Sequence, residues 1–326
     1  MTDPHSVTRR GFLGSLSAGG IMAGPTLLHF AQVTDSEPQV ASSYRLIDTH
    51  VYLFQWPFRL IHSAETAELV RSLKNAGVTC AWAGSLESLL HRDIASVNAR
   101  LHEECRKYGD GFLVPCGTIN PMLPDWTEDF RQCVENYKMR VLRLFPGYHG
   151  YTLDIPEVGR LLALAHKCEI GIQITIEMED VRAQNPLLPV KPVEVTPLGR
   201  WLEDFPALRL MLLNCHRAVP PQQLAKLVTI GWVYVDLGML EGIAGLERLT
   251  SVIPIERICF GSFAPVFYFE SALLKLAESH LPGGSLDAIC YQNAETFSHR
   301  QPPYPRKGGF PMPYQRTCAV WLASSG

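Results

Sequence analysis

The feature that most constrains this chain is a regular alternation of short apolar runs with segments of helical period. From Leu46 onward, eight apolar runs of strand length follow one another, and amphipathic segments separate them. This alternation is typical of repeated βαβ units, in which helices connect parallel strands. The expected strands span residues 46–54, 78–84, 111–120, 140–147, 170–177, 208–216, 232–239 and 257–265.

Eight strand–helix pairs predict a closed (β/α)8 barrel rather than an open sheet. The alternative, a doubly wound sheet, would carry a G-x-G-x-x-G fingerprint after its first strand, and none occurs there. The expected helices span residues 64–76, 92–108, 125–137, 156–168, 196–205, 220–229, 242–252 and 269–279. We therefore expect one TIM-barrel domain over residues 44–298, of class α/β.

The two ends of the chain differ from the repeating part. Residues 1–43 contain "TRRGFLG", with paired arginines before an apolar, Gly-rich stretch, which is similar to a twin-arginine export signal. This predicts a periplasmic location, with a cytoplasmic one as the alternative. The stretch is too short and Gly-rich for a stable membrane span. Residues 299–326 are rich in Pro and Gly and predict an irregular tail.

Composition excludes several classes of partner. The net charge is −3 with no block of like charges, so no nucleic-acid or anionic-membrane partner is expected. The nine cysteines include no C-x-x-C pair, which argues against a zinc ribbon or a redox motif. A small-molecule substrate remains the expected partner, and a homo-oligomer is left open.

Side-chain alternation predicts which polar residues enter the barrel. Residues two apart on a strand share a face, and one face of each barrel strand points inward. The polar residues that share such faces are Asp48, His50 and Tyr52 in the first strand, Gln173, Thr175 and Glu177 in the fifth, Asn214 and His216 in the sixth, and Tyr234 and Asp236 in the seventh.

Arg143 shares a face with Phe145 in the fourth strand, so its charge needs a partner inside the barrel. One interpretation pairs it with Asp236, Glu177 or Asp48. The other leaves the guanidinium facing the cavity as an anion-binding group.

Active sites of such barrels lie at the C-terminal strand ends. The ionisable and polar residues that fall at this end are His50, Tyr52, His149, Glu177, Glu179, His216, Asp236 and Ser262.

Four segments make the chain recognisable: "IDTHVYLF", "LNCHRA", "FGSFAP" and "NAETF". In order and spacing they resemble the amidohydrolase superfamily, and the nearest branch is the amidohydrolase-related metal-dependent hydrolases, which include decarboxylases and lactonases. The resemblance implies H-x-H in the first strand, a histidine ending each of the fifth and sixth strands, and an aspartate in the eighth. Here Tyr52 replaces the second histidine, Gln173 or its neighbours stand at the fifth strand, and Phe263 replaces the aspartate.

Two distant changes in one expected site favour loss of the metal, because phenylalanine can neither bind zinc nor accept a proton. No cofactor is therefore favoured. The alternative is zinc or manganese in a rearranged site that draws on His50, His149, His216, Glu177 and Asp236.

The favoured mechanism is metal-free. His50 or His149 acts as acid or base, Asp236 or Glu177 orients it, and Arg143 holds a carboxylate or carbonyl. The expected catalytic residues are His50, Arg143, His149 and Asp236; the expected substrate-binding residues are Tyr52, Trp56, Tyr148, Gln173, Glu177, His216 and Ser262.

Three hypotheses follow. The first is a metal-free hydrolase, lactonase-like or decarboxylase-like, for a small carboxylated substrate. The second is a non-catalytic, ligand-binding barrel, and the third is a metalloenzyme with rearranged ligands. The catalytic hypothesis requires a cavity above Arg143 and His50.

Overall fold

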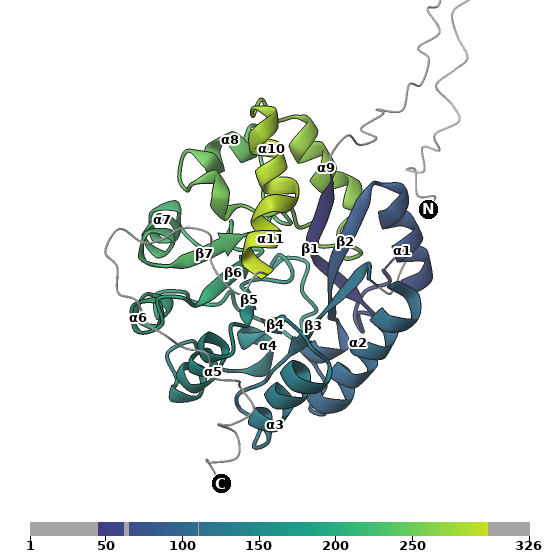
Figure 1. Cartoon of the computed structure of the whole chain (residues 1–326), viewed down its shortest axis with the longest axis vertical. Coiled ribbons are helices and arrows are strands. Elements are labelled where there is room, and N and C mark those ends of the chain that lie inside the picture. Colours follow the sequence, from purple (N-terminus) through teal and green to yellow (C-terminus); the bar gives the residue numbers. More distant parts are fainter. Residues whose placement is uncertain (1–44, 62–64, 110, 299–326) are drawn as a thin grey trace, which may run out of the picture. The chain divides into compact units, whose positions relative to one another are not determined.

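The computed structural model describes residues 45–61, 65–109 and 111–298, and the expected export segment and C-terminal tail lie outside them. Seven parallel strands form one curled sheet, in which each strand pairs with the next along the chain (Figure 1). The strands are β1 (Leu46–Leu53), β2 (Val78–Ser85), β3 (Leu113–Thr118), β4 (Val141–Leu144), β5 (Gly171–Thr175), β6 (Arg209–Leu213) and β7 (Trp232–Val235).

The segment 258–264 closes the sheet between β7 and β1. It forms two isolated parallel bridges, Val235 with Ile258 and Val51 with Ala264. It was expected to be a full eighth strand, but Phe263 has a φ of 65° and the Ser262 amide donates to the Asp48 carboxylate, so regular pairing is interrupted. The TIM-barrel prediction is confirmed, with an irregular closing segment.

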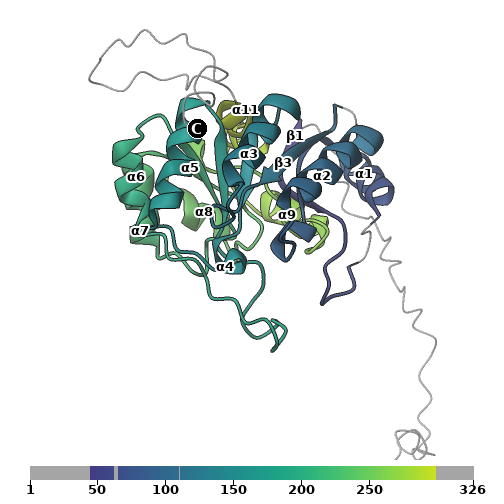
Figure 2. The same ribbon diagram turned by 90° about the horizontal axis from the view of Figure 1, so that it is seen from below.

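Helices cover the outside of the sheet (Figures 1 and 2). The eight expected helices are present, and α4 and the α10–α11 region were not expected. The α-helices are α1 (Thr66–Asn75), α2 (Ile94–Gly109), α3 (Trp126–Arg131), α4 (Pro146–His149), α5 (Pro156–Lys167), α6 (Leu198–Asp204), α7 (Pro221–Ile230), α8 (Gly245–Thr250), α9 (Phe269–Ala277), α10 (Gly283–Asp287) and α11 (Asn293–Ser298). Short 3₁₀ turns are η1 (Glu87–Leu89) and η3 (Ile255–Arg257), and π-helical turns are η2 (Gln132–Asn136) and η4 (Ala288–Gln292).

The two ends of the barrel carry different elements. Figure 2 shows α11 at one end, and α4 with the long loop between β5 and α6 at the other, where the strands have their C-terminal ends. The loop was predicted to be long and irregular, and it contains no helix or strand. Within the described ranges, no helix combines the length and apolar character needed to cross a bilayer.

Side-chain alternation divides the core into an outer and an inner part. The outer cluster, between sheet and helices, contains Ile172, Ile174, Leu210 and Leu212, whereas Met211 belongs to the inner cluster. The row of Leu210 and Leu212 was expected to continue through Asn214 into the site. Instead that row packs on the helices, and Asn214 enters the interior because its φ of 55° breaks the alternation at the strand end.

Candidate functional site

A histidine–aspartate pair lies at the centre of the barrel. His50 of β1 and Asp236, directly after β7, have no exposed surface, and His50 Nδ1 lies 2.7 Å from Asp236 Oδ2. The backbone amides of Asn214 and Gly238 also donate to the Asp236 carboxylate, at 2.8 and 3.2 Å. The prediction that these two residues share the interior agrees with the geometry.

The charge states of the pair follow from burial and hydrogen bonding. Burial lowers the pKa of His50 to about 4, although Asp236 opposes this shift. Burial acts to raise the pKa of Asp236, but the hydrogen bond and the charge of His50 leave it below its ordinary value. At neutral pH the imidazole is therefore neutral and donates from Nδ1 to an ionised carboxylate. His50 Nε2 is then an acceptor, and it is buried without a partner among the described residues.

A second carboxylate lies beside this pair. Asp48 Oδ1 accepts from the amides of His50 and Ser262, each at 3.0 Å, and Oδ2 accepts from Ser262 Oγ at 2.5 Å. Burial nevertheless raises the pKa of Asp48 to about 6. Asp48 thus ties the closing segment to β1, a role that the sequence did not single out.

Arg143 is also completely buried, but its partners are not the expected ones. Nε donates to Gln173 Oε1 at 2.8 Å, and Nη1 donates to the Val51 carbonyl at 3.0 Å. Nη2 lies 3.3 Å from the carbonyls of both Thr49 and Trp82. No carboxylate of the described residues lies within ion-pair distance, so the expected pairing with Asp236, Glu177 or Asp48 is wrong. Backbone carbonyls fill that role, and they leave no sequence signature.

These residues form what we call the polar layer: Asp48, His50, Arg143, Gln173 and Asp236. Above it, toward the C-terminal strand ends, lies the mouth layer, defined as Tyr52, Phe145, Met178, Met239 and Phe263. All five members of the mouth layer are buried in one apolar cluster.

Phe263 is the member of the mouth layer that covers His50. The two rings stack with centroids 4.8 Å apart and planes 24° apart. Phe263 also adopts a left-handed backbone conformation, which is costly for an aromatic residue. Its side chain therefore closes the position where the resemblance implies an aspartate.

The two layers together seal the centre of the barrel. His50 and Arg143 each have 0% exposed surface and face packed side chains. The condition that a cavity lie above them is not met in this closed structure, and each nitrogen of the Arg143 guanidinium donates to an acceptor inside the barrel.

Three other expected site residues use their polar atoms on partners inside the protein. His149 of α4 places Nε2 2.8 Å from the Ser88 carbonyl, and His216 places Nε2 2.7 Å from the Asp236 carbonyl. Gln173 donates to the Thr49 carbonyl at 2.8 Å. These side chains serve as internal hydrogen-bond partners in the structure.

The expected rim residues do gather at the mouth. The Trp56 and Tyr148 rings meet edge to face, 5.9 Å apart, and Trp56 Nε1 is buried without a partner among the described residues. Glu179 lies 3.4 Å from Arg59, and Glu177 is nearly buried, which raises its pKa.

The donors present do not fit a metal ion. Within the described ranges, no group of three or more His, Cys, Asp or Glu side chains is placed to bind one. His149 and His216 use Nε2 elsewhere, and the Asp236 carboxylate already accepts three hydrogen bonds. Of the donors proposed for a rearranged site, His50 and Asp236 lie together, but the described residues supply no third donor placed to complete a metal site with them.

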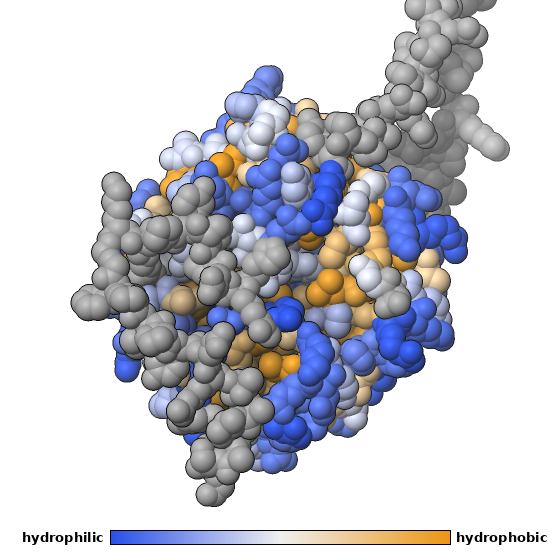
Figure 3. All heavy atoms as spheres, viewed as in Figure 1, coloured by the Kyte–Doolittle hydropathy of each residue, from blue (hydrophilic) through white to orange (hydrophobic). Residues whose placement is uncertain are grey.

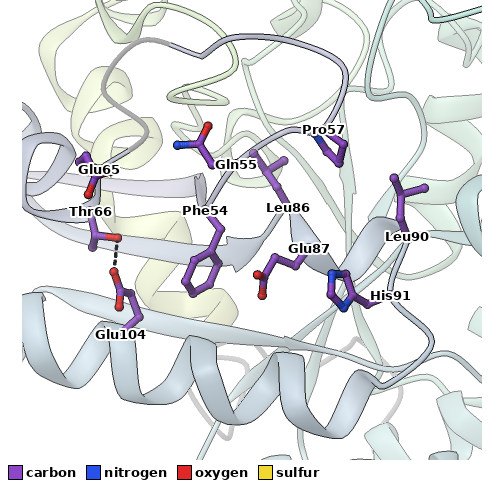
Figure 4. A pocket seen from close by; sticks show the side chains of 10 residues that line it. All are labelled: Phe54, Gln55, Pro57, Glu65, Thr66, Leu86, Glu87, Leu90, His91 and Glu104. Carbon is purple, nitrogen blue, oxygen red and sulfur yellow. Dashed lines mark hydrogen bonds between the residues drawn. The ribbon is translucent and has the colours of Figure 1, made fainter.

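Two of the cavities outside the sealed centre have the volume of a small-molecule site. One of about 360 Å³ lies between the end of β1 and α2, and Figure 4 shows Glu65, Glu87, Glu104 and His91 around it. Glu104 and Glu87 are already bonded to Thr66 and Arg100. The other, of about 900 Å³, lies at the N-terminal strand ends and is lined by Ile47, Trp82, Val114, Arg45 and Arg140, among others. Figure 3 shows this face, with apolar atoms near its middle.

The sequence of residues 87–297 matches the family model described as Amidohydrolase, which covers more than half of the chain. The chain belongs to the amidohydrolase family. The match begins after β1, so the strand that carries His50 and Tyr52 lies outside it. No protein of curated function matches this amidohydrolase-family chain.

Several solved structures share the fold of this family member. The 2,6-dihydroxybenzoate decarboxylase from Rhizobium is 12% identical, with a TM-score of 0.59 over 78% of this chain and 98% of that one. The 5-carboxyvanillate decarboxylase from Novosphingobium aromaticivorans, complexed with manganese, is 12% identical, with a TM-score of 0.62 over 78% and 96%. The 4-oxalomesaconate hydratase from Rhodopseudomonas palustris is 14% identical, with a TM-score of 0.58 over 78% and 96%. At these identities the similarity shows the fold alone.

Proposed function

We propose that this chain is a non-catalytic member of its family, which binds a small hydroxylated aromatic molecule in the barrel mouth without a metal ion. The observation that carries the proposal is that two buried polar atoms lack a partner among the described residues: His50 Nε2 in the polar layer, and Trp56 Nε1 beside Tyr148 at the mouth. A buried polar atom without a partner costs about 1–3 kcal/mol, so a missing ligand is a physical explanation for both.

The two open atoms limit the ligand. Neutral His50 Nε2 accepts a hydrogen bond and suits a ligand hydroxyl, whereas Trp56 Nε1 donates one and suits a carbonyl or carboxylate oxygen. The surrounding Tyr52, Phe145 and Phe263 side chains suit an aromatic ring. The relatives named for dihydroxybenzoate and carboxyvanillate act on molecules of this kind.

Binding requires the mouth to open. Phe263 is the group that must move, because its ring covers His50. Its left-handed backbone conformation costs of order 1–3 kcal/mol, which a rearrangement of the closing segment would release.

Turnover is not expected, because Arg143 cannot reach the ligand and the residues offered as additional acids or bases face elsewhere. The second candidate is metal-free acid–base catalysis on the same ligand. The geometry of His50 and Asp236 favours it, since a carboxylate orients an imidazole whose second nitrogen is free.

Binding and turnover of 2,6-dihydroxybenzoate distinguish the candidates. We expect isothermal titration calorimetry to report saturable binding by the wild type, weaker binding of benzoate, and about tenfold loss of affinity in Trp56→Phe for one lost hydrogen bond. We expect no release of carbon dioxide with or without manganese. Release that disappears in His50→Ala would establish the catalytic candidate, and absence of any binding would refute both.

A further inference from the structure

Arg143 occupies a site built for a cation. It is the largest fully buried side chain of the described residues. Four oxygen atoms accept from its guanidinium, namely Gln173 Oε1 and the carbonyls of Val51, Thr49 and Trp82, at 2.8 to 3.3 Å. An array of carbonyl oxygens without a carboxylate is a neutral cage for a positive charge.

Two further residues shape this cage. The guanidinium carbon lies 4.6 Å from the centroid of the Tyr52 ring, a cation–π distance. A Cβ added at Gly84 would come within 2.6 Å of Arg143 Nη1, so β2 needs glycine at this position to admit the guanidinium. Strands β1, β2, β4 and β5 therefore all contribute to the cage.

The carboxylate of Asp236 places a negative charge in the same interior. Asp236 is fully buried, and its carboxylate accepts from a neutral imidazole and two amides, none of which neutralises it. A buried anion is stable only when a positive charge or strong donors compensate it.

We propose that Arg143 is the resident cation of this barrel: its guanidinium fills a carbonyl cage and fixes β1 on both sides of His50, in the same interior as the buried carboxylates. The permanent charge of a guanidinium and its planar set of N–H donors suit this cage better than an ammonium group would. The chain thus carries its own positive charge in an interior whose side-chain donors do not fit a metal ion.

Chemical rescue tests this proposal. Arg143→Ala empties the cage, and free guanidinium should enter it, whereas urea has a similar shape but no charge. With guanidinium chloride at about ten times its dissociation constant, we expect the thermal midpoint of the variant to rise by about 3 °C or more. Equal concentrations of urea or sodium chloride should produce no rise.

The control is Arg182→Ala, which removes an arginine that is 87% exposed on its side chain and paired with Asp180. Its midpoint should not rise with guanidinium. Rescue of Arg143→Ala by urea as well, or a folded Arg143→Ala that guanidinium does not stabilise, would overturn the proposal.

If Arg143→Ala does not fold, two variants with larger side chains at this position test the proposal instead. Arg143→Lys keeps the charge, and Arg143→Met keeps much of the volume without it. We expect the lysine variant to unfold at the higher temperature. A methionine variant of equal or greater stability would show that packing alone is needed and would overturn the proposal.

Discussion

The polar layer and the mouth layer fill the same barrel but differ in how they are held together. In the polar layer nearly every donor and acceptor has a partner inside the protein, and two buried carboxylates are joined to the closing segment and to β1. The mouth layer contains aromatic rings and thioethers, and its one hydroxyl, on Tyr52, is only weakly bonded. This difference indicates that the hydrogen bonds of the polar layer stabilise the fold. The mouth layer instead closes the position where the resemblance implies a catalytic aspartate.

The largest expected effect on stability comes from substitution of Arg143. Arg143→Met would leave four buried oxygen acceptors without their donor. We expect the free energy of unfolding, measured with urea, to fall by about 3–5 kcal/mol. The control Arg182→Met, at an exposed position, should change it by less than about 0.5 kcal/mol. Equal effects at the two positions would show that buried Arg143 stabilises the fold no more than an exposed arginine does.

The next effect is on the pH dependence of stability, to which His50 and Asp48 contribute with opposite sign. The folded-state pKa of His50 is lowered from 6.5 to about 4, so its contribution to stability is lost as pH falls from 6.5 toward 4. The pKa of Asp48 is raised from 3.8 to about 6, so its contribution is present below 3.8 and is lost as pH rises through 6. Each shift corresponds to roughly 3 kcal/mol, and the two contributions partly cancel in the wild type.

Asp48→Asn removes one of these opposing groups. Between pH 6.5 and 4 we expect the variant to lose about 3 kcal/mol of unfolding free energy relative to the wild type, measured by urea denaturation at several pH values. Parallel pH profiles for the two proteins would mean that Asp48 titrates normally.

A smaller effect is expected for the residue that closes the mouth. Phe263→Gly removes a buried ring, which should lower the free energy of unfolding by about 3–5 kcal/mol. Glycine, however, adopts the φ of 65° without strain, which offsets part of this loss. The net loss should therefore be roughly 2–3 kcal/mol, and diethyl pyrocarbonate should modify His50 faster than in the wild type. The control is Tyr268→Ala, which removes an aromatic ring that is 72% exposed and should leave the rate of His50 modification unchanged. Unchanged modification of His50 in Phe263→Gly would show that another group seals the site.

The smallest effect tests the claim that the mouth layer depends little on hydrogen bonds. The Tyr52 hydroxyl lies 3.4 Å from Thr175 Oγ and 3.5 Å from Met178 Sδ. Tyr52→Phe should change the unfolding free energy by less than about 0.5 kcal/mol, because such long contacts contribute little. Tyr52→Leu, which also removes the ring facing Arg143, should cost more. A loss in Tyr52→Phe as large as in Tyr52→Leu would assign the stabilisation to the hydroxyl.

The fold could be predicted from the sequence because periodicity and strand length repeat through the whole barrel. The closing segment was expected to be regular, since nothing in "RICFGSFAP" indicates that Phe263 adopts a left-handed conformation. Alternation placed His50 and Asp236 on inner faces correctly. It also predicted that Asn214 faces inward, but on one face with Leu210 and Leu212, whereas those two leucines pack on the helices and Asn214 turns inward through its positive φ at the end of β6.

The partners of Arg143 were beyond the reach of sequence analysis for a physical reason. A buried guanidinium can be satisfied by any acceptor, and carbonyl oxygens are present at every residue. The sequence predicted only carboxylates as partners, whereas the guanidinium donates to the carbonyls of Thr49, Val51 and Trp82. The glycine at position 84, which leaves room for the guanidinium, is the one sequence signal that could have pointed to this strand.

Metal stoichiometry tests the central claim, that this barrel holds its centre together with an arginine rather than a metal ion. The wild type, purified from manganese- and zinc-supplemented medium and dialysed, would be compared with a Tyr52→His and Phe263→Asp double variant by mass spectrometry of bound metals. We expect far less than one ion per wild-type chain and a clear increase in the double variant, which regains two donors. One tightly held ion per wild-type chain would contradict the account.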